Sequence, residues 1–310
     1  MNFLFKIILI VIFVFSIEES KANTLLDSLN SAYLKNPKLN AERAKKRASK
    51  EEKMEAFSEF LPSVTISAYN SEQDNTGGAA SNFKPSEQSM KIEQKIFQGF
   101  AGVANIKKKR YGYNIAEFKL KKVEQETLLA AAKAHADLLL NKKKVNINLI
   151  NIDLLERQIE TDQNRLDKGE INLTDLAQSE SSFLGAKAEL ISAQNDLVTS
   201  KANFEKIIGK KAPDNIQEIK KIKINLPDSL ATAYKISNSE NPDLQIAFLE
   251  FEQSKLDVTI ARSDLSPSAT LSYKISEQDD MSSTVQDRTQ QTVTATATWP
   301  LFSGGDNIFN

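Results

Sequence analysis

The stretch from Leu176 to Ile207, LAQSESSFLGAKAELISAQNDLVTSKANFEKI, decides the fold of this chain. Two series recur every seventh residue, one with large side chains and one with mostly small ones: Leu176, Phe183, Leu190, Leu197 and Phe204, and Ser179, Ala186, Ala193, Ser200 and Ile207. A heptad pattern sustained over this length predicts coiled-coil packing of a long helix. A second apolar stripe follows one residue later, at Ala177, Leu184, Ile191 and Val198. Two stripes predict apolar neighbours on two sides, which suits a ring of helices better than a pair.

The arm before this stretch carries a less regular pattern. Its apolar residues are spaced alternately by four and three positions, at Val145, Leu149, Ile152, Ile159 and Leu166. Glu156 and Gln163 occupy the two positions of this series that are not apolar. Because no Pro lies between Gly102 and Leu173, one helix from Ala104 to Leu166 would be about 95 Å long at ~1.5 Å per residue. The chain is expected to turn at Leu166–Gly169, which makes residues 100–212 a long helical hairpin. A solvated dimeric coiled coil without a particular function is the alternative here.

The composition excludes several classes of protein. The 310 residues carry a net charge of −1 with 26% charged side chains, which excludes a strongly basic nucleic-acid binder. Short runs of Lys are expected on solvated helix faces. The chain has no Cys, so disulfides, thiol catalysis and thiolate metal sites are excluded together with a lipid-modified N-terminal Cys.

The N-terminus has the pattern of an export signal. Lys6 precedes the apolar run Ile7–Phe15, and Ser20-Lys21-Ala22 places small residues where a signal peptidase cleaves. The run is shorter than the ~20 residues that a membrane-spanning helix needs. Residues 1–22 are therefore expected to be a signal peptide, and the mature protein to begin at Asn23.

The chain contains an internal repeat with a constant offset of 205 residues (242 − 37). Four pairs of motifs share it: Asn36-Pro37 and Asn241-Pro242, Pro62-Ser63 and Pro267-Ser268, Ser71–Asp74 and Ser276–Asp279, and Phe97-x-Gly99 and Phe302-x-Gly304. Four motif pairs with the same offset, and no insertion or deletion between them, indicate duplication of one unit. The repeat divides the mature chain into first helices at 23–61, a β-hairpin at 62–99, a connection at 213–227, a second-repeat helix at 228–266 and a second β-hairpin at 267–304.

Each hairpin shows the period of two that is typical of half-apolar strands. Val64, Ile66 and Ala68 alternate with polar residues, and Val293, Ala295, Ala297, Trp299 and Leu301 do the same in the second repeat. Strands of roughly 9 to 11 residues have the length that a tilted transmembrane strand needs, although a half-exposed soluble sheet shows the same alternation. The export signal, the attached rods and three aromatic residues at strand ends favour the membrane. Those aromatics, Phe97, Trp299 and Phe302, are predicted to lie at a membrane interface.

Four strands are too few to close a membrane barrel, because the smallest such barrels have about eight. Unpaired strand edges in lipid would cost several kcal/mol for each backbone group. Copies of the chain are therefore expected to assemble, and three copies would supply twelve strands.

These features resemble the TolC family of outer-membrane efflux proteins over essentially the whole mature chain. The most specific motif is the turn Arg165-Leu166-Asp167-Lys168-Gly169 followed by Thr174-Asp175-Leu176, which is similar to the family's Arg-aromatic-x-x-Gly and Thr-Asp-Val turn. Leu166 departs from the usual aromatic residue. The Pro after each inbound helix and the Phe-x-Gly before each outbound helix also fit the family.

The resemblance implies a mainly α protein with a small β part. It implies a homotrimer in which a 12-stranded β-barrel in outer-membrane lipid continues into an α-barrel in the periplasm. Such a protein would be the passive exit duct of a tripartite efflux or type I secretion system, fed by an inner-membrane pump. A periplasmic adaptor (membrane fusion) protein would contact the tip, at Arg165, Leu166, Asp167, Lys168 and Gly169, with Thr174 and Asp175 shaping the turn. Gly169 as a plain helix cap and Thr174 as a plain helix start are the alternative.

The second repeat stops at Asn310, just where the first enters its long helix. Residues 305–310 are interpreted as the start of a missing second helical hairpin, so no gate residue is assigned. A longer parent protein is expected, and a non-transporting fragment is the alternative.

The sequence offers no site for chemistry. His135 is the sole histidine and is interpreted as a packing or surface residue. No catalytic residue, cofactor or metal site is predicted, and an enzyme is not expected. A soluble periplasmic coiled-coil adaptor or chaperone remains the second functional hypothesis.

Overall fold

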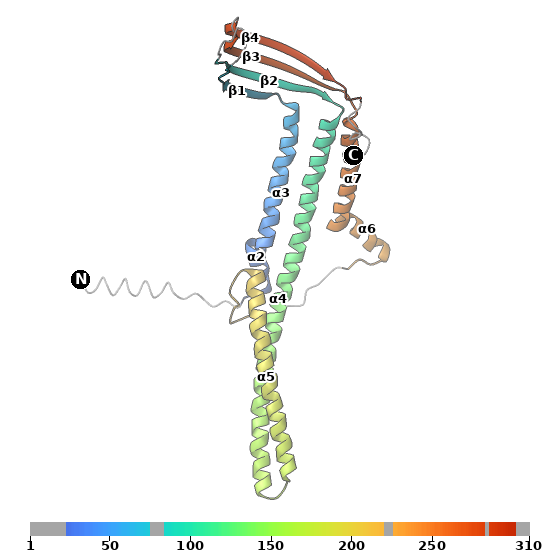
Figure 1. Ribbon diagram of the computed structural model, residues 1–310. Coiled ribbons are helices and arrows are strands. Elements are labelled where there is room, and N and C mark those ends of the chain that lie inside the picture. Colours follow the sequence, from blue (N-terminus) through green and yellow to red (C-terminus); the bar gives the residue numbers. More distant parts are fainter. Residues whose placement is uncertain (1–22, 75–83, 220–225, 283–284, 302–310) are drawn as a thin grey trace, which may run out of the picture. The chain divides into compact units, whose positions relative to one another are not determined.

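The computed structural model describes residues 23–74, 84–219, 226–282 and 285–301 (Figure 1). The predicted signal peptide at 1–22, Phe302 and the segment 305–310 lie outside these residues. The described helices are α2 (Leu25–Lys35), α3 (Pro37–Glu55), η1 (Ala56–Phe60), α4 (Ala101–Asp167), α5 (Leu173–Ile208), α6 (Leu230–Glu240) and α7 (Pro242–Ser263). The strands are β1 (Ser63–Asn70), β2 (Ser86–Gln98), β3 (Ser268–Ser282) and β4 (Val285–Thr298). Long helices with a four-stranded antiparallel sheet confirm the mainly α class with a small β part.

The chain forms two compact units, and α4 contributes residues to both. The first unit contains residues 1–41 and 122–227, and the second contains residues 42–121 and 228–310. No helix among the described residues combines the length and the apolar character needed to cross a membrane.

The first unit is built on the antiparallel pair formed by α4 and α5, with α2 packed against the end of α5. Its core is a cluster of buried apolar residues from these three helices: Ala32, Ala131, Ala134, Leu138, Phe204 and Ile208. Local sequence fixes both ends of α5. Asn172 forms a capping box with Asp175 at the start, and Gly209 ends the helix at φ 73°, a left-handed conformation that favours glycine.

The heptad of α5 faces α4 as the sequence predicts, but the predicted phase of α4 is wrong in part. Leu149 is exposed, and Glu156 and Gln163 also point to solvent. The positions toward α5 are instead Asn148, Leu155 and Asp162, which follow Val145, Ile152 and Ile159 by three residues. Two of these three residues are polar. A pattern based on apolar side chains therefore selects the adjacent positions 149, 156 and 163 instead. The two polar residues are accommodated because Asp162 accepts a hydrogen bond from Ser179 Oγ at 2.6 Å and Asn148 donates to the Glu189 carbonyl at 3.4 Å.

The segment predicted as the second-repeat helix, 228–266, contains two helices in the structure, α6 and α7. Asn241 has φ −70° and ψ 115°, outside the helical region. The following Pro242 causes the break, since its ring disfavours a helical conformation in the preceding residue. Asn36 before Pro37 has φ −63° and ψ 122° and separates α2 from α3 in the same way. The two breaks are related by the internal repeat.

The second unit contains the sheet, whose strand order is β1-β2-β3-β4 with every pair antiparallel. β2, β3 and β4 have 13, 15 and 14 residues, longer than predicted, while β1 has 8. The longer strands continue into residues such as Glu277 and Asp279, because backbone pairing does not stop where the apolar pattern does. The prediction that β4 includes Trp299 and Leu301 is wrong, since the strand ends at Thr298.

A tight turn connects β2 to α4. Gly99 and Phe100 both have positive φ, 57° and 68°. A Cβ on Gly99 would lie 2.6 Å from Ser266 Cβ, so only glycine allows this close approach to the segment after α7. Beyond the turn, ion pairs from Lys109 to Glu52 at 3.0 Å and from Lys108 to Asp257 at 2.5 Å join α4 to α3 and α7.

Candidate membrane-facing sheet and hairpin tip

The sheet has one apolar face, formed by alternate residues brought into rows by the strand register. These residues are Val64, Ile66, Met90, Ile92, Phe97, Ala269, Leu271, Tyr273, Ile275, Val293, Ala295 and Ala297. One row pairs Val64, Ile92, Tyr273 and Val293 across all four strands. Ile66 and Val293 are largely exposed. We call this surface the apolar face.

The apolar face is long enough to form a large part of a membrane-spanning band. It extends along β3 from Ala269 to Ile275, about 20 Å at ~3.4 Å per residue, and the next residues of the same parity are Glu277 and Asp279. The apolar band of transmembrane barrels is ~25 Å tall and their strands are tilted. The apolar face therefore supplies part of the height of such a band.

The opposite face of the sheet is polar and carries linked charges. Lys91 and Lys274 are direct cross-strand partners, an arrangement that by itself is destabilising. Each lysine has a carboxylate partner: Lys274 pairs with Glu87 at 2.5 Å, and Lys91 pairs with Glu93. Glu87 also accepts a hydrogen bond from Gln278 at 2.8 Å. Lys95, which pairs with Thr270, also lies on this face. Ser and Thr side chains occupy many of the other positions, so the face suits contact with water.

Aromatic residues gather at the helical end of the sheet. Phe97 packs edge to face on Phe100, with ring centroids 5.4 Å apart. Trp299, an exposed residue, donates its Nε1 proton to the Leu265 carbonyl at 3.1 Å. Phe60 and Phe100 are also exposed and belong to the same surface, although neither was predicted from the sequence. The sequence places Phe60 close to Pro62 and Phe100 close to Phe97, but this closeness alone does not identify them.

The hairpin tip is held by backbone bonds and caps. The Gly169 and Glu170 amides donate to the Leu166 and Arg165 carbonyls at 2.8 and 2.9 Å. Gly169 has φ 75°, and a Cβ at this position would meet no atom within 4 Å. Conformation rather than space therefore favours glycine there. Leu166 is half-buried.

The charged residues of the tip divide between internal contacts and exposure. Arg165 lies 3.8 Å from Asp162 and 3.5 Å from Glu170, yet its side chain remains 48% exposed. Asp175 caps the start of α5. The remaining predicted tip residues, Asp167, Lys168 and Thr174, are exposed. The structure thus brings these residues together at one turn; their contact with an adaptor stays a prediction.

Each arm of the hairpin carries an apolar stripe that nothing in the described chain covers. On α5 the second stripe of the sequence pattern is exposed, at Leu184, Ile191 and Val198. On α4 an exposed stripe at the same interval of seven residues contains Leu140, Ile147 and Leu154. We call these six residues the outer stripes.

His135 and Asp162 are two of the buried polar residues of the first unit. His135 Nδ1 lies 2.9 Å from Ser28 Oγ, and its Nε2 lies 3.4 Å from the Gln217 carbonyl. Burial lowers the pKa of His135 below its ordinary value of 6.5. Hydrogen bonds from Ser179 and then Gln158 lower the pKa of Asp162, so this carboxyl stays ionised in the seam between the arms.

Comparisons with known proteins agree with this arrangement. A family model described as outer membrane efflux protein matches residues 28–210. The outer membrane efflux protein BepC of Brucella suis biovar 1 (strain 1330) is 26% identical over 286 residues, which are 92% of this chain and 62% of BepC. CusC superposes with a TM-score of 0.79 at 14% identity, over 93% of this chain and 68% of the CusC chain. The CmeC outer membrane channel of Campylobacter jejuni gives 0.79 at 14% identity, over 91% of this chain and 62% of CmeC.

The fold is therefore the one found in outer membrane channels such as CmeC. The family model covers more than half of the chain, and the chain belongs to the outer membrane efflux protein family. This confirms the resemblance seen in the sequence and assigns the chain to the outer membrane and periplasm, in a family of channels rather than enzymes. The chain spans 62% of the length of BepC.

Proposed function

We propose that this chain is the subunit of a trimeric exit duct that carries efflux cargo through the periplasm and the outer membrane. The observation that carries the proposal is the sheet, which has one apolar and one polar face and ends at β1 and β4. Within the described residues, β1 pairs with β2 alone and β4 with β3 alone. In lipid each unpaired backbone group costs several kcal/mol, so the free edges favour closure by further copies. Three copies would supply twelve strands.

The outer stripes support the same assembly. Exposed apolar residues at intervals of seven match the packing surface of a helix that has neighbours on two sides. The α4–α5 seam provides one neighbour within the chain. Helices of adjacent copies would cover the outer stripes on the second side, which would build a hollow cylinder of helices.

The hairpin tip is the proposed docking site for a periplasmic adaptor protein, which in turn recruits an inner-membrane pump. The proposal includes Arg165, Leu166, Asp167, Lys168 and Gly169, while Thr174 and Asp175 shape the turn. Partial exposure of Arg165 and exposure of Lys168 leave both cations available to a partner. The duct itself is passive, so energy would come from the pump.

A pair of substitutions on β4 tests the membrane face. Val293 lies on the apolar face and Thr294 on the polar face. A lysine near the bilayer midplane costs about 2 to 4 kcal/mol on the lipid side. We expect Val293→Lys to reduce the membrane-inserted trimer strongly and Thr294→Lys to leave it near the wild-type level. Quantitative blotting of unheated, detergent-extracted outer membranes measures both.

The result that contradicts the proposal is equal tolerance of the two lysines. Recovery of the wild-type protein in the soluble periplasm without detergent would favour the soluble adaptor or chaperone instead.

A further inference from the structure

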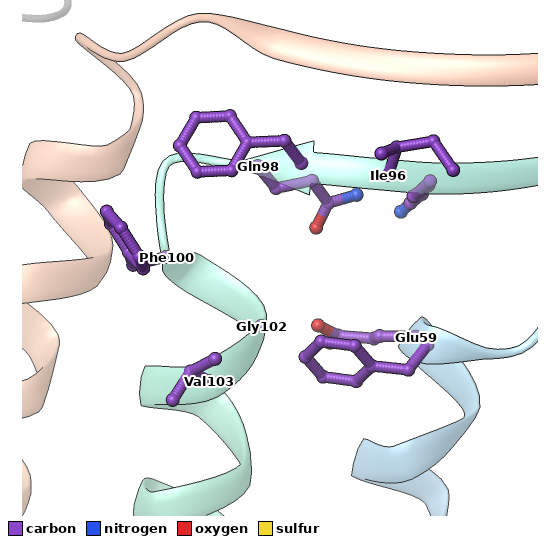
Figure 2. Close-up of a pocket in the computed structure, with 9 residues that line it drawn as sticks. Glu59, Ile96, Gln98, Phe100, Gly102 and Val103 are labelled. Carbon is purple, nitrogen blue, oxygen red and sulfur yellow. The ribbon is translucent and has the colours of Figure 1, made fainter.

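We propose that the cavity between η1, β2 and the start of α4 binds the end of an acyl chain of a membrane phospholipid. This inference rests on the proposed function, because it requires the apolar face to lie in lipid. Figure 2 shows the cavity at the junction of the three elements, with side chains contributed by each of them.

The size and lining of the cavity favour a chain end over a complete small molecule. Its volume is about 210 Å³, below the ~300 to 1,000 Å³ typical of pockets for drug-sized ligands. Apolar side chains form most of the wall, namely Phe60, Ile96, Phe97, Phe100 and Val103, and the polar side chains in it are Lys95, Gln98 and Glu59. A narrow apolar space with a single amine matches one end of a hydrocarbon chain near an anionic group.

Local backbone features hold the cavity open. Ile96 is the unpaired residue of a bulge between β2 and β3, and bulges redirect side chains from the sheet. Gly102 lets η1 approach α4, since a Cβ there would lie 2.9 Å from the Phe60 ring. Asn105 donates a hydrogen bond to Glu59 Oε1 at 2.5 Å. This bond anchors η1 and engages the acidic group that lines the cavity.

The position of the cavity favours lipid as its occupant. Phe97 pairs with Ala269 in the last row of the apolar face and also lines the cavity. Phe97 therefore belongs both to the apolar face and to the wall of the cavity. Ile96 and Phe100 are exposed, and lipid contact would remove that surface from water. Lys95 lines the cavity, and its amine is the group that we expect to contact the phospholipid phosphate.

The test uses the full-length trimer in lipid nanodiscs that contain phosphatidylglycerol with a diazirine at the end of one acyl chain. After irradiation, mass spectrometry maps the labelled peptides. We expect labels both on the apolar face, around Val293, and on residues 95–103. Val103→Trp fills the cavity and should reduce labelling of 95–103 at least fivefold. Val258→Trp is the matched control, because Val258 is similarly exposed, at 51% against 46% for Val103, but lies on α7.

Two outcomes separate this inference from the proposed function. Labels on the apolar face without labels on residues 95–103, or unchanged labelling of Val103→Trp, overturn the cavity proposal alone. If a second copy of the chain filled the cavity, the apolar face would be labelled and residues 95–103 would not. Absence of label at both places in a folded trimer contradicts the membrane face itself.

A second variant tests the headgroup contact without altering the cavity walls. Lys95→Gln should remove a preference for phosphatidylglycerol over phosphatidylcholine in the labelling of residues 95–103, while labelling around Val293 stays constant. If the wild type shows no such preference, or Lys95→Gln retains it, Lys95 does not contact the headgroup and that part of the proposal is overturned.

Discussion

At the scale of single residues, His135 shows how a polar side chain can be part of the core. It is fully buried in α4 and joins α2, through Ser28, to the segment after α5, through the Gln217 carbonyl. Because a carbonyl can only accept, Nε2 carries the proton and Nδ1 accepts from the Ser28 hydroxyl. Asn23 donates to the same hydroxyl at 3.1 Å. This chain of hydrogen bonds fits the neutral imidazole.

The burial of His135 predicts a pH dependence of stability. Its folded pKa is below the ordinary 6.5, so between the two values the unfolded chain binds more protons than the folded one. The free energy of unfolding therefore has its full value above pH 6.5 and decreases as pH falls through that value toward the folded pKa. Thermal unfolding of the detergent-solubilised protein at about pH 7.5 and about pH 5 should show this loss, and His135→Gln should reduce it.

Ser28→Ala serves as the control, because it removes the donor to Nδ1 but keeps the titrating group. It should cost about 1 to 3 kcal/mol near neutral pH while the pH dependence persists. An identical pH dependence in wild type and His135→Gln would assign the effect to other groups.

At the scale of elements, the turn between α4 and α5 contains residues that hold its structure and residues that are exposed to solvent. Gly169 supplies a positive φ, and Asn172 with Asp175 caps the next helix. Arg165 contacts Asp162 and Glu170 at 3.8 and 3.5 Å while staying half exposed. An exposed ion pair such as Arg165–Glu170 contributes about 0 to 1 kcal/mol, and the contact with the buried Asp162 is long, at 3.8 Å. Arg165 therefore adds little to the stability of the hairpin and is free for another role.

Replacement of Arg165 tests that role. We expect Arg165→Ala to reduce export of an efflux substrate several-fold while the yield and thermal stability of the trimer remain near wild type, because its internal ion pairs are weak. Arg157→Ala is the control: Arg157 is also exposed on α4 and also forms an ion pair, with Asp153 at 3.0 Å. Substrate accumulation in cells and blotting of the trimer give the two readouts. Loss of the trimer in Arg165→Ala would make the turn a structural element rather than a docking site.

At the scale of the whole molecule, two kinds of surface are incomplete in a single chain. The sheet ends at β1 and β4, and the outer stripes expose large apolar side chains along both arms of the hairpin. Neither surface suits a monomer in its surroundings, because one leaves backbone groups unpaired in lipid and the other leaves an apolar stripe in water. Both favour assembly of identical copies.

The outer stripe of α5 offers a test of assembly that leaves the sheet unchanged. Ile191→Lys places a charge in the proposed contact between copies and should shift the protein from trimer toward monomer in detergent, by about tenfold or more. Its helical circular dichroism should remain, because Ile191 is 60% exposed in the chain. Asn195→Lys, at another exposed position of α5, should not change the trimer. Size-exclusion chromatography with light scattering measures the mass; an unaffected trimer in Ile191→Lys would place the contact elsewhere.

Much of the architecture could be predicted because the patterns are local and repeated. The heptad of α5, the absence of Pro from α4 and the period of two in the strands follow from helix and strand geometry alone, and the internal repeat relates the breaks before Pro37 and Pro242. The tip residues could be named by resemblance. Phe60 and Phe100 could not, because their part in the aromatic surface depends on η1 and α4 meeting at Gly102.

The sequence by itself determined which segments are helices and strands, since hydrophobic periodicity and proline positions act on residues close in the chain. The tertiary structure alone decided which side of α4 meets α5, because polar Asn148 and Asp162 enter that seam only when Glu189 and Ser179 supply hydrogen bonds. It also decided which apolar stripe is covered within the chain and which is left for another copy. Which face of a helix is covered depends on residues that are distant in the sequence. The periodicity of one helix therefore does not specify it.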